Sequence, residues 1–170
     1  MTAPIRRRTR ARELAMQLLF QYDVRGADYA AQVGRSPAEL LDEECQGDAE
    51  VVKFALQLVE GTLEHRAAID ARLQAVTRNW DLRRMANVDR NVLRMAIYEL
   101  LFCTDVPPKV AINEAIELGK RYSTANSGGF VNGILDRVRI DVERERRATA
   151  AATPTGAEPR PTAEAGGAEA

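Results

Sequence analysis

The chain has 170 residues, of which 45% are hydrophobic and 29% are charged, and its net charge at pH 7 is −1. This length and composition fit one folded unit with an ordinary core and exclude a multidomain enzyme. Because the net charge is close to zero, any attraction to a polyanion must come from a local cluster of charge.

The first predicted element is a helix over residues 9–24, preceded by a cluster of arginines. Apolar residues recur along it at helical spacing, and Gly26 marks its end. Guanidinium groups bind phosphates through paired donors and stack on bases, so the cluster indicates RNA contact, although a merely solvated basic terminus fits this segment as well. The candidate RNA-binding residues here are Arg6, Arg7, Arg8, Arg10 and Arg12.

One aromatic residue of this helix lies opposite the apolar line. At about 100° per residue, Phe20 shares a face with Thr9, Glu13 and Gln17. An exposed ring close to an arginine cluster suits single-stranded RNA, because a ring stacks an unpaired base for roughly 1–3 kcal/mol. The alternative is that Phe20 packs beneath the 26–47 segment.

Two helices are expected next. A capping-box pattern that begins at Ser36 predicts a short helix over residues 37–46. Asp48 is expected to cap the longest helix of the molecule, which continues towards residue 80. Within it, Gly61 is either a weak point or a site of close packing.

A turn over residues 81–87 leads to a central helix that Asp89 is expected to cap and that ends near Cys103. The helix is apolar around most of its circumference, but a polar stripe crosses it. Buried guanidinium groups are costly when unpaired, so this stripe should meet either internal acids or a partner protein. Its members are Arg90, Asn91, Arg94 and Tyr98.

Two more helices are expected after Pro107 and Pro108, over residues 110–122 and 130–147. From residue 148 the chain lacks aliphatic side chains larger than Ala, which predicts a disordered tail over 148–170. The pattern as a whole predicts an all-α fold of about seven helices. They form two packed subdomains, at about 9–80 and 81–147.

A second basic and aromatic group precedes the last helix, which Ser127 is expected to cap. Glycines at a helix start let a ligand approach the backbone, and the free amides and helix dipole of the first turn favour a phosphate. The alternative is a capped loop whose Phe130 completes the core. The RNA-binding candidates here are Lys120, Arg121, Tyr122, Ser127, Gly128 and Phe130.

Other classes of site have little support in the sequence. His65 is the only histidine, and Cys45 and Cys103 are too few and too far apart for a zinc site or a disulfide framework, so both cysteines are expected to be small core residues. Catalytic and nucleotide-binding motifs are missing. We therefore expect no enzyme activity, no cofactor and no metal. Without a signal peptide or membrane span, the sequence predicts a cytoplasmic protein.

Four segments, taken in order, resemble the NusB family of bacterial transcription antitermination factors over about residues 6–140. They read RRRTRARE from residue 6, VDRNVLRMAIYEL from residue 88, DVPPKVAINEAIEL from residue 105 and FVNGILD from residue 130. The resemblance implies an all-α protein that binds the boxA element of nascent ribosomal RNA transcripts together with the ribosomal protein NusE. Other Nus factors and RNA polymerase would join this pair.

The resemblance also implies where the contacts lie. It places the arginine-rich start and the rings of Phe20, Tyr122 and Phe130 on the RNA side. It places Asp89 and its central helix near both the partner and the RNA. On that basis the predicted partner-binding residues are Asp89, Arg90, Arg94 and Tyr98. The chain departs from common family residues at Phe20 (often Tyr), Asn126 (often an acid) and Gly129 (often Lys), which bears on the strength and register of RNA contact.

Two other functions are compatible with parts of the sequence. The same fold occurs as an accessory domain of some RNA methyltransferases, but only a short tail follows it here, which argues against methyl transfer. A helical protein-interaction module without RNA binding of its own is the alternative function, motivated by apolar area around the central helix. The sequence leaves the oligomeric state open, including a homodimer.

Overall fold

The computed structural model describes residues 4–78 and 80–153, and these residues form helices and connecting loops without a strand. The predicted all-α fold is confirmed. The α-helices are α1 (Pro4–Arg25), α2 (Tyr29–Gln32), α3 (Pro37–Cys45), α4 (Ala49–Glu64), α5 (Arg66–Val76), α6 (Asn87–Phe102), α7 (Pro108–Tyr122) and α8 (Ser127–Ala152), with a 3-10 turn at Leu82–Arg84.

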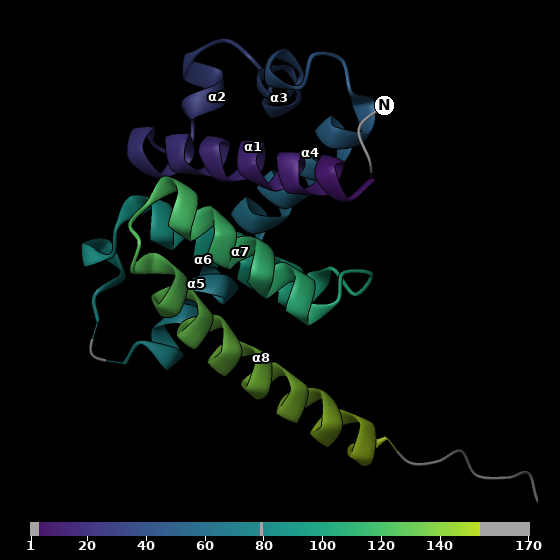
Figure 1. Cartoon of the computed structure of the whole chain (residues 1–170), viewed down its shortest axis with the longest axis vertical. Helices are drawn as coiled ribbons and strands as arrows, with labels where there is room; N and C mark the ends of the chain where they lie inside the picture. Colours follow the sequence, from purple (N-terminus) through teal and green to yellow (C-terminus); the bar gives the residue numbers. More distant parts are fainter. Residues whose placement is uncertain (1–3, 79, 154–170) are drawn as a thin grey trace, which may run out of the picture.

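Helix α6 lies at the centre, and every residue from Asp89 to Leu100 is buried. Helix α1 packs on α4 and α6 and runs beside α7, while α7 and α8 pack on each other and on α6 (Figure 1). The predicted apolar line of α1, which includes Ala11 and Tyr22, is in the core. The predicted division of the chain into two subdomains near residue 80 stays a prediction. Helix α5 precedes that point in sequence but packs mainly against α6 and α8, which follow it.

The predicted start signals of α3 and α4 are confirmed by their capping hydrogen bonds. The Glu39 amide donates to Ser36 Oγ at 3.2 Å, and the Ser36 amide donates to Glu39 Oε2 at 2.6 Å. Asp48 Oδ1 accepts from the Val51 amide at 3.4 Å at the start of α4. Side-chain oxygens thus satisfy first-turn amides, as a helix start requires.

The long helix predicted after Asp48 is wrong, because the chain breaks at His65 into α4 and α5. The imidazole of His65 stacks on the Phe102 ring with centroids 4.0 Å apart. The apolar spacing continues across the break, but α4 packs mainly against α1 whereas α5 packs mainly against α6 and α8. Spacing alone therefore could not reveal the change of direction. The longest helix of the described residues is α8, with 26 residues.

Three predicted ends also need correction. Ala86 occupies the N-cap position of α6, and Asp89 lies in its first turn, where a carboxylate still favours the positive end of the helix dipole. Asn126 is the N-cap residue of α8, so Ser127 is its first helical residue. Helix α8 extends past residue 147 to Ala152 and leads away from the bundle (Figure 1). The rest of the predicted disordered tail, residues 154–170, lies outside the described residues.

Gly61 is a site of close packing between α4 and α6. A Cβ atom at this position would lie 2.1 Å from the Tyr98 ring. Cys103 is buried as expected, and burial first, followed by the nearby charges of Glu99 and Asp105, raises the pKa of its thiol to about 11. Cys45 is half-buried. In the described part of the chain, the helices lack the combination of length and apolarity needed to cross a membrane.

Candidate nucleic-acid interface

The candidate interface is built where α1 lies beside α7. Thr9 Oγ1 donates to Glu114 Oε1 at 2.9 Å, and two turns further along α7 the guanidinium of Arg121 donates to Glu13 Oε1. The face of α1 that carries Thr9 and Glu13 is therefore turned towards α7. Phe20 continues this face and is half-buried.

The 26–47 segment covers a different side of α1. Its residues Tyr29 and Leu40 line a pocket against α1, and Phe20 is not part of that lining, which on α1 consists of Leu14, Gln17, Leu18, Gln21 and Arg25. The alternative that Phe20 packs beneath this segment is therefore not supported. Phe20 stays available as a ring at the edge of the surface between α1 and α7.

Glu13 joins the arginine-rich start of α1 to the end of α7. One carboxylate oxygen accepts from Arg10 Nη1 at 3.1 Å, and the other accepts from Arg121 Nη1. Glu13 itself is buried, whereas both arginines are exposed. We call Arg10, Glu13 and Arg121 the Glu13 junction. It brings two basic segments that are more than 100 residues apart in sequence to one point of the surface.

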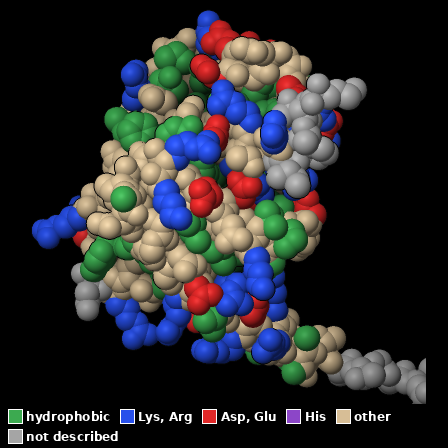
Figure 2. Space-filling model, viewed as in Figure 1, with side chains coloured by type: hydrophobic (Ala, Val, Ile, Leu, Met, Phe, Trp, Pro, Cys, Tyr) green, Lys and Arg blue, Asp and Glu red, His purple; other side chains and the backbone are tan. Residues whose placement is uncertain are grey.

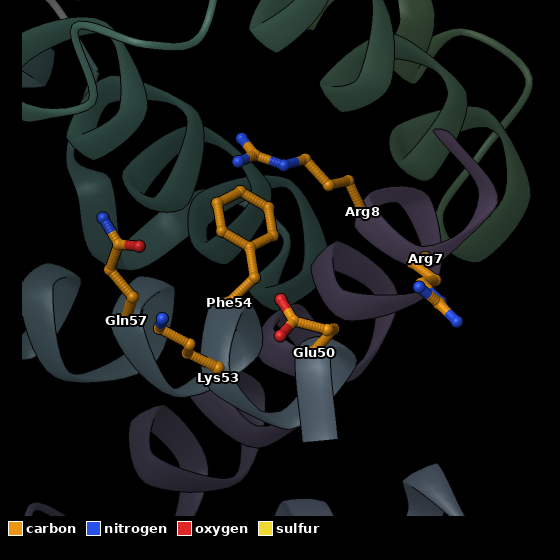
Figure 3. A pocket seen from close by; sticks show the side chains of 6 residues that line it. All are labelled: Arg7, Arg8, Glu50, Lys53, Phe54 and Gln57. Atoms are coloured by element: carbon orange, nitrogen blue, oxygen red, sulfur yellow. The ribbon is translucent and has the colours of Figure 1, made fainter. Parts of the chain in front are cut away.

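The preceding arginines face the other side of α1, towards the start of α4 (Figure 3). The guanidinium of Arg8 lies over the Phe54 ring, 4.4 Å from its centroid, and also donates to Asp105 Oδ2 at 3.3 Å. Arg7 Nε lies 3.3 Å from Asp48 Oδ2. These arginines line a pocket of about 360 Å³ with Glu50, Lys53, Phe54 and Gln57. Arg6 is exposed at the beginning of the helix.

Arg12 differs from the other arginines of the cluster, because only 2% of its surface is exposed. Its Nε and Nη2 donate to the two carboxylate oxygens of Glu99 on α6, at 2.8 and 2.9 Å. Burial alone would lower the pKa of Arg12, but the hydrogen bonds and charge of Glu99 outweigh it and raise the pKa. Arg12 thus holds α1 to α6, and its expected contact with RNA is corrected.

The polar stripe of α6 also turns inward. Arg90 donates from Nε and Nη2 to Asp23 Oδ2 at 2.9 and 2.6 Å, and Arg94 donates to both oxygens of Asp70 at 2.7 and 3.0 Å. Asn91 Nδ2 also donates to Asp23, at 3.0 Å. Of the two outcomes left open by the sequence, the structure selects internal acids.

Tyr98 is likewise buried, with its ring against Gly61. The expected partner contacts of Arg90, Arg94 and Tyr98 are therefore corrected, because these side chains are enclosed in the fold. Asp89 is a different case. It is as buried as Arg90 and Tyr98, but among the described residues its Oδ1 has no hydrogen-bond partner.

The RNA-binding candidates around the turn between α7 and α8 also include both exposed and buried residues. Lys120 and Arg121 are exposed, and Tyr122 is half-buried against the core. Ser127 and Gly128 are buried, and a Cβ atom at position 128 would lie 2.7 Å from the Lys120 side chain. The glycine therefore admits the Lys120 stem, and the expected approach of a ligand to this backbone is corrected.

Phe130 stacks on a residue that sequence reasoning did not select. The rings of Phe130 and Trp80 lie 5.2 Å apart at an interplanar angle of 21°. Trp80 stands just after the helical pattern of α5 ends, and a large ring placed where a buried pattern has stopped is the signal that could have identified it. Phe130 is half-buried at the edge of the core, which is intermediate between the two alternatives.

Basic side chains are spread over the face where α1, α7 and α8 lie, with acidic side chains between them (Figure 2). Among the described residues, groups of His, Cys, Asp or Glu suited to holding a metal ion do not occur. Fold and surface together define a class of protein: a small helical bundle with a mixed arginine and aromatic surface typical of nucleic-acid binding.

Comparison with known proteins identifies the family within this class. The chain belongs to the NusB family, whose model matches residues 9–139. A transcription antitermination protein NusB from Anaeromyxobacter sp. (strain Fw109-5) is 52% identical over 145 residues, which are 84% of this chain and 96% of that protein.

Solved structures agree with this assignment. T. maritima NusB is 39% identical and aligns with a TM-score of 0.69, over 83% of this chain and 94% of that chain. A chain of a crystal structure of the antitermination factors NusB and NusE in complex with double-stranded RNA is 28% identical. It aligns with a TM-score of 0.67, over 80% of this chain and 98% of that chain.

Proposed function

We propose that this protein binds boxA-type single-stranded RNA in nascent ribosomal RNA transcripts, together with the ribosomal protein NusE. As a member of the NusB family it is a transcription antitermination protein and not an enzyme. The observation that carries the RNA proposal is the Glu13 junction, where Arg10 and Arg121 meet on the face of α1 that also carries the half-buried Phe20, about two turns further along the helix. A relative whose crystal structure contains NusE and double-stranded RNA supports the NusE and RNA contacts in general.

The exposed arginines are suited to exchanging partners. Arg10 and Arg121 share the buried carboxylate of Glu13, so a phosphate can bind one of these exposed arginines while the other still pairs with that carboxylate. Phosphates would bind Arg6, Arg7, Arg8, Arg10, Lys120 and Arg121. The rings of Phe20, Tyr122 and Phe130 would stack unpaired bases. Such contacts hold the strand but carry little sequence information.

The partner proposal rests on Asp89. Its Oδ1 is buried at the first turn of α6 and has no hydrogen-bond partner in the described part of the chain, and a buried carboxylate oxygen without a donor is unfavourable. A donor from NusE would satisfy it. Bound to RNA and NusE, the protein would join other Nus factors and RNA polymerase in the cytoplasm. It would act by raising the effective concentration of its partners on the growing transcript.

The alternative of a protein-interaction module without RNA binding loses its motivation, because the apolar circumference of α6 is buried from Asp89 to Leu100. A titration separates the two functions. We expect the anisotropy of a labelled boxA-type RNA to rise with added protein, and to rise at lower protein concentration when NusE is present. An unchanged anisotropy with and without NusE would contradict the proposed function.

A further inference from the structure

Trp80 presents an open ring at a fixed place on the surface. It is the only tryptophan of the chain and is 56% exposed. Its amide donates to the Thr77 carbonyl at 2.7 Å, and its carbonyl accepts from Gln74 Nε2 at 3.1 Å. Phe130 supports the ring by stacking. The position of Trp80 is therefore held by its neighbours while much of the ring faces solvent.

A basic hollow lies between the end of α5 and α8, and its lining includes Arg78, two residues before Trp80 in sequence. Its volume is about 470 Å³, and its charged residues are Arg78, Arg137, Arg144 and Asp141. Arg137 follows Phe130 by seven residues, or about two helical turns, so both lie on one face of α8. Arg144 follows on the same face after a further seven residues. One side of α8 thus carries a ring and then two guanidinium groups in a row.

The acid in this hollow does not neutralise it. Asp141 is the only carboxylate of the lining, against three arginines. It lies 3.7 Å from Arg137, whose side chain is still 62% exposed. Such an exposed pair is weak and easily exchanged for a phosphate. The hollow therefore offers positively charged hydrogen-bond donors near the exposed ring of Trp80.

We infer that Trp80 and the hollow formed by Arg78, Arg137 and Arg144 bind a further stretch of the same single-stranded RNA. This inference rests on the proposed function and extends it beyond α1 and α7. Trp80 stacks a base on its open side, and the three arginines contact successive phosphates. A flat ring beside three guanidinium groups fits a single strand, because every base has a face that can stack and every linkage carries a negative charge.

The new surface is continuous with the Glu13 junction. Gly128 on the first turn of α8 packs against the stem of Lys120, which precedes Arg121. Phe130 follows two residues later and holds Trp80. A strand that leaves Arg121 can therefore pass Lys120 and the ring pair on its way to the hollow.

The single tryptophan makes the inference directly measurable. A boxA-type RNA oligonucleotide, and the same oligonucleotide extended at its 5′ or its 3′ end, are titrated into the full chain while Trp80 emission and RNA anisotropy are recorded. We expect one of the extended RNAs to quench the emission and to bind more tightly than the short one. Stacking on Trp80 is the cause of the quenching.

Two sets of variants test the assigned contacts. Trp80→Ala is expected to weaken binding of the extended RNA about tenfold, or about 1.4 kcal/mol, within the range for one stacked base, whereas Trp80→Phe retains most of the affinity. Replacing Arg137 and Arg144 by Gln is expected to lower the slope of log affinity against log salt by about 1.4, since one phosphate contact contributes about 0.7. The matched control is Phe102→Ala, which removes a 43% exposed ring stacked on His65.

The outcomes are distinguishable. If RNA binds, as seen by anisotropy, but the emission of Trp80 and the affinity of Trp80→Ala are both unchanged, the inference is overturned and the proposed function stands. If NusE alone changes the emission and RNA does not, the surface is a protein contact and the inference is also overturned. If RNA of any length leaves the anisotropy unchanged, the proposed function fails and the inference fails with it.

Discussion

Two arginines of α1 that are two residues apart in sequence differ in burial. Arg12 is enclosed between α1 and α6 and held by both oxygens of Glu99, whereas Arg10 lies on the surface and shares Glu13 with Arg121. A buried charge needs a dedicated partner, while an exposed charge can change partners. The position of an arginine on the helix surface therefore decides whether its side chain stabilises the fold or is free to bind a ligand. Its membership in a basic cluster does not decide this.

The buried pair gives the largest expected effect. Replacing Glu99 by Gln leaves the enclosed guanidinium of Arg12 with only the more distant carboxylate of Glu114, 3.8 Å from its Nη1, so we expect the free energy of unfolding to fall by about 3–5 kcal/mol. Urea denaturation measures this change. The replacement of both residues by apolar ones, Arg12→Met with Glu99→Leu, is the control and should recover much of the loss. A Glu99→Gln protein as stable as the unchanged chain would show that Arg12 does not depend on this pair.

A second test of the buried region uses pH. Burial alone would raise the pKa of Asp23, but hydrogen bonds from Arg90 and Asn91, with the charges of Arg90 and Arg94, lower it. Because the pKa is lower in the folded state, the stabilisation by the ionised carboxylate is complete above about pH 4, the ordinary value for Asp. It is lost as the pH falls through the lower folded-state pKa.

We therefore expect Asp23→Asn to be less stable than the unchanged chain above about pH 4, and the gap in unfolding free energy to narrow as the pH falls further. Urea denaturation at a series of pH values measures the gap. Asp42→Asn, which removes an exposed carboxylate of α3, is the control and should give a small gap throughout. A gap for Asp23→Asn that widens in acid would reverse the assignment.

The surface region gives the smallest effect on stability. Arg121→Gln removes one exposed partner of Glu13 but leaves Arg10 to pair with the buried carboxylate, so we expect the free energy of unfolding to change by less than about 1 kcal/mol. The same urea denaturation applies, with Arg35→Gln as a control because Arg35 is also exposed and paired with an acid. A loss as large as that of Glu99→Gln would mean that the Glu13 junction belongs to the fold.

The sequence predicted those features that depend on neighbours along the chain. The capping box at Ser36, the cap at Asp48 and the buried line of α1 are set by local hydrogen bonds and spacing, and all three are confirmed. The break at His65 was not predictable in this way. The break depends on the packing of α5 against α6 and α8, and the helical spacing of apolar residues contains no information about that packing.

The candidate site was predictable in part for the same reason. Helical geometry placed Phe20 opposite the apolar line of α1, and the structure leaves its ring half-buried beside α7. Helical geometry could not reveal that Arg12 would pair with Glu99, 87 residues away, or that Trp80 would stack on Phe130. The local pattern around Gly128 was also ambiguous, because a glycine that admits a ligand and one that admits a lysine stem look alike in sequence.

The most direct test of the account is the salt dependence of boxA-type RNA binding by the protein with Arg10→Gln and Arg121→Gln combined. The account predicts weaker binding and a slope of log affinity against log salt that is lower by about 1.4, because each arginine neutralises one phosphate of a single strand at about 0.7 per contact. Arg35→Gln should leave the slope unchanged. An unaltered slope and affinity in the double variant would contradict the claim that the Glu13 junction binds RNA.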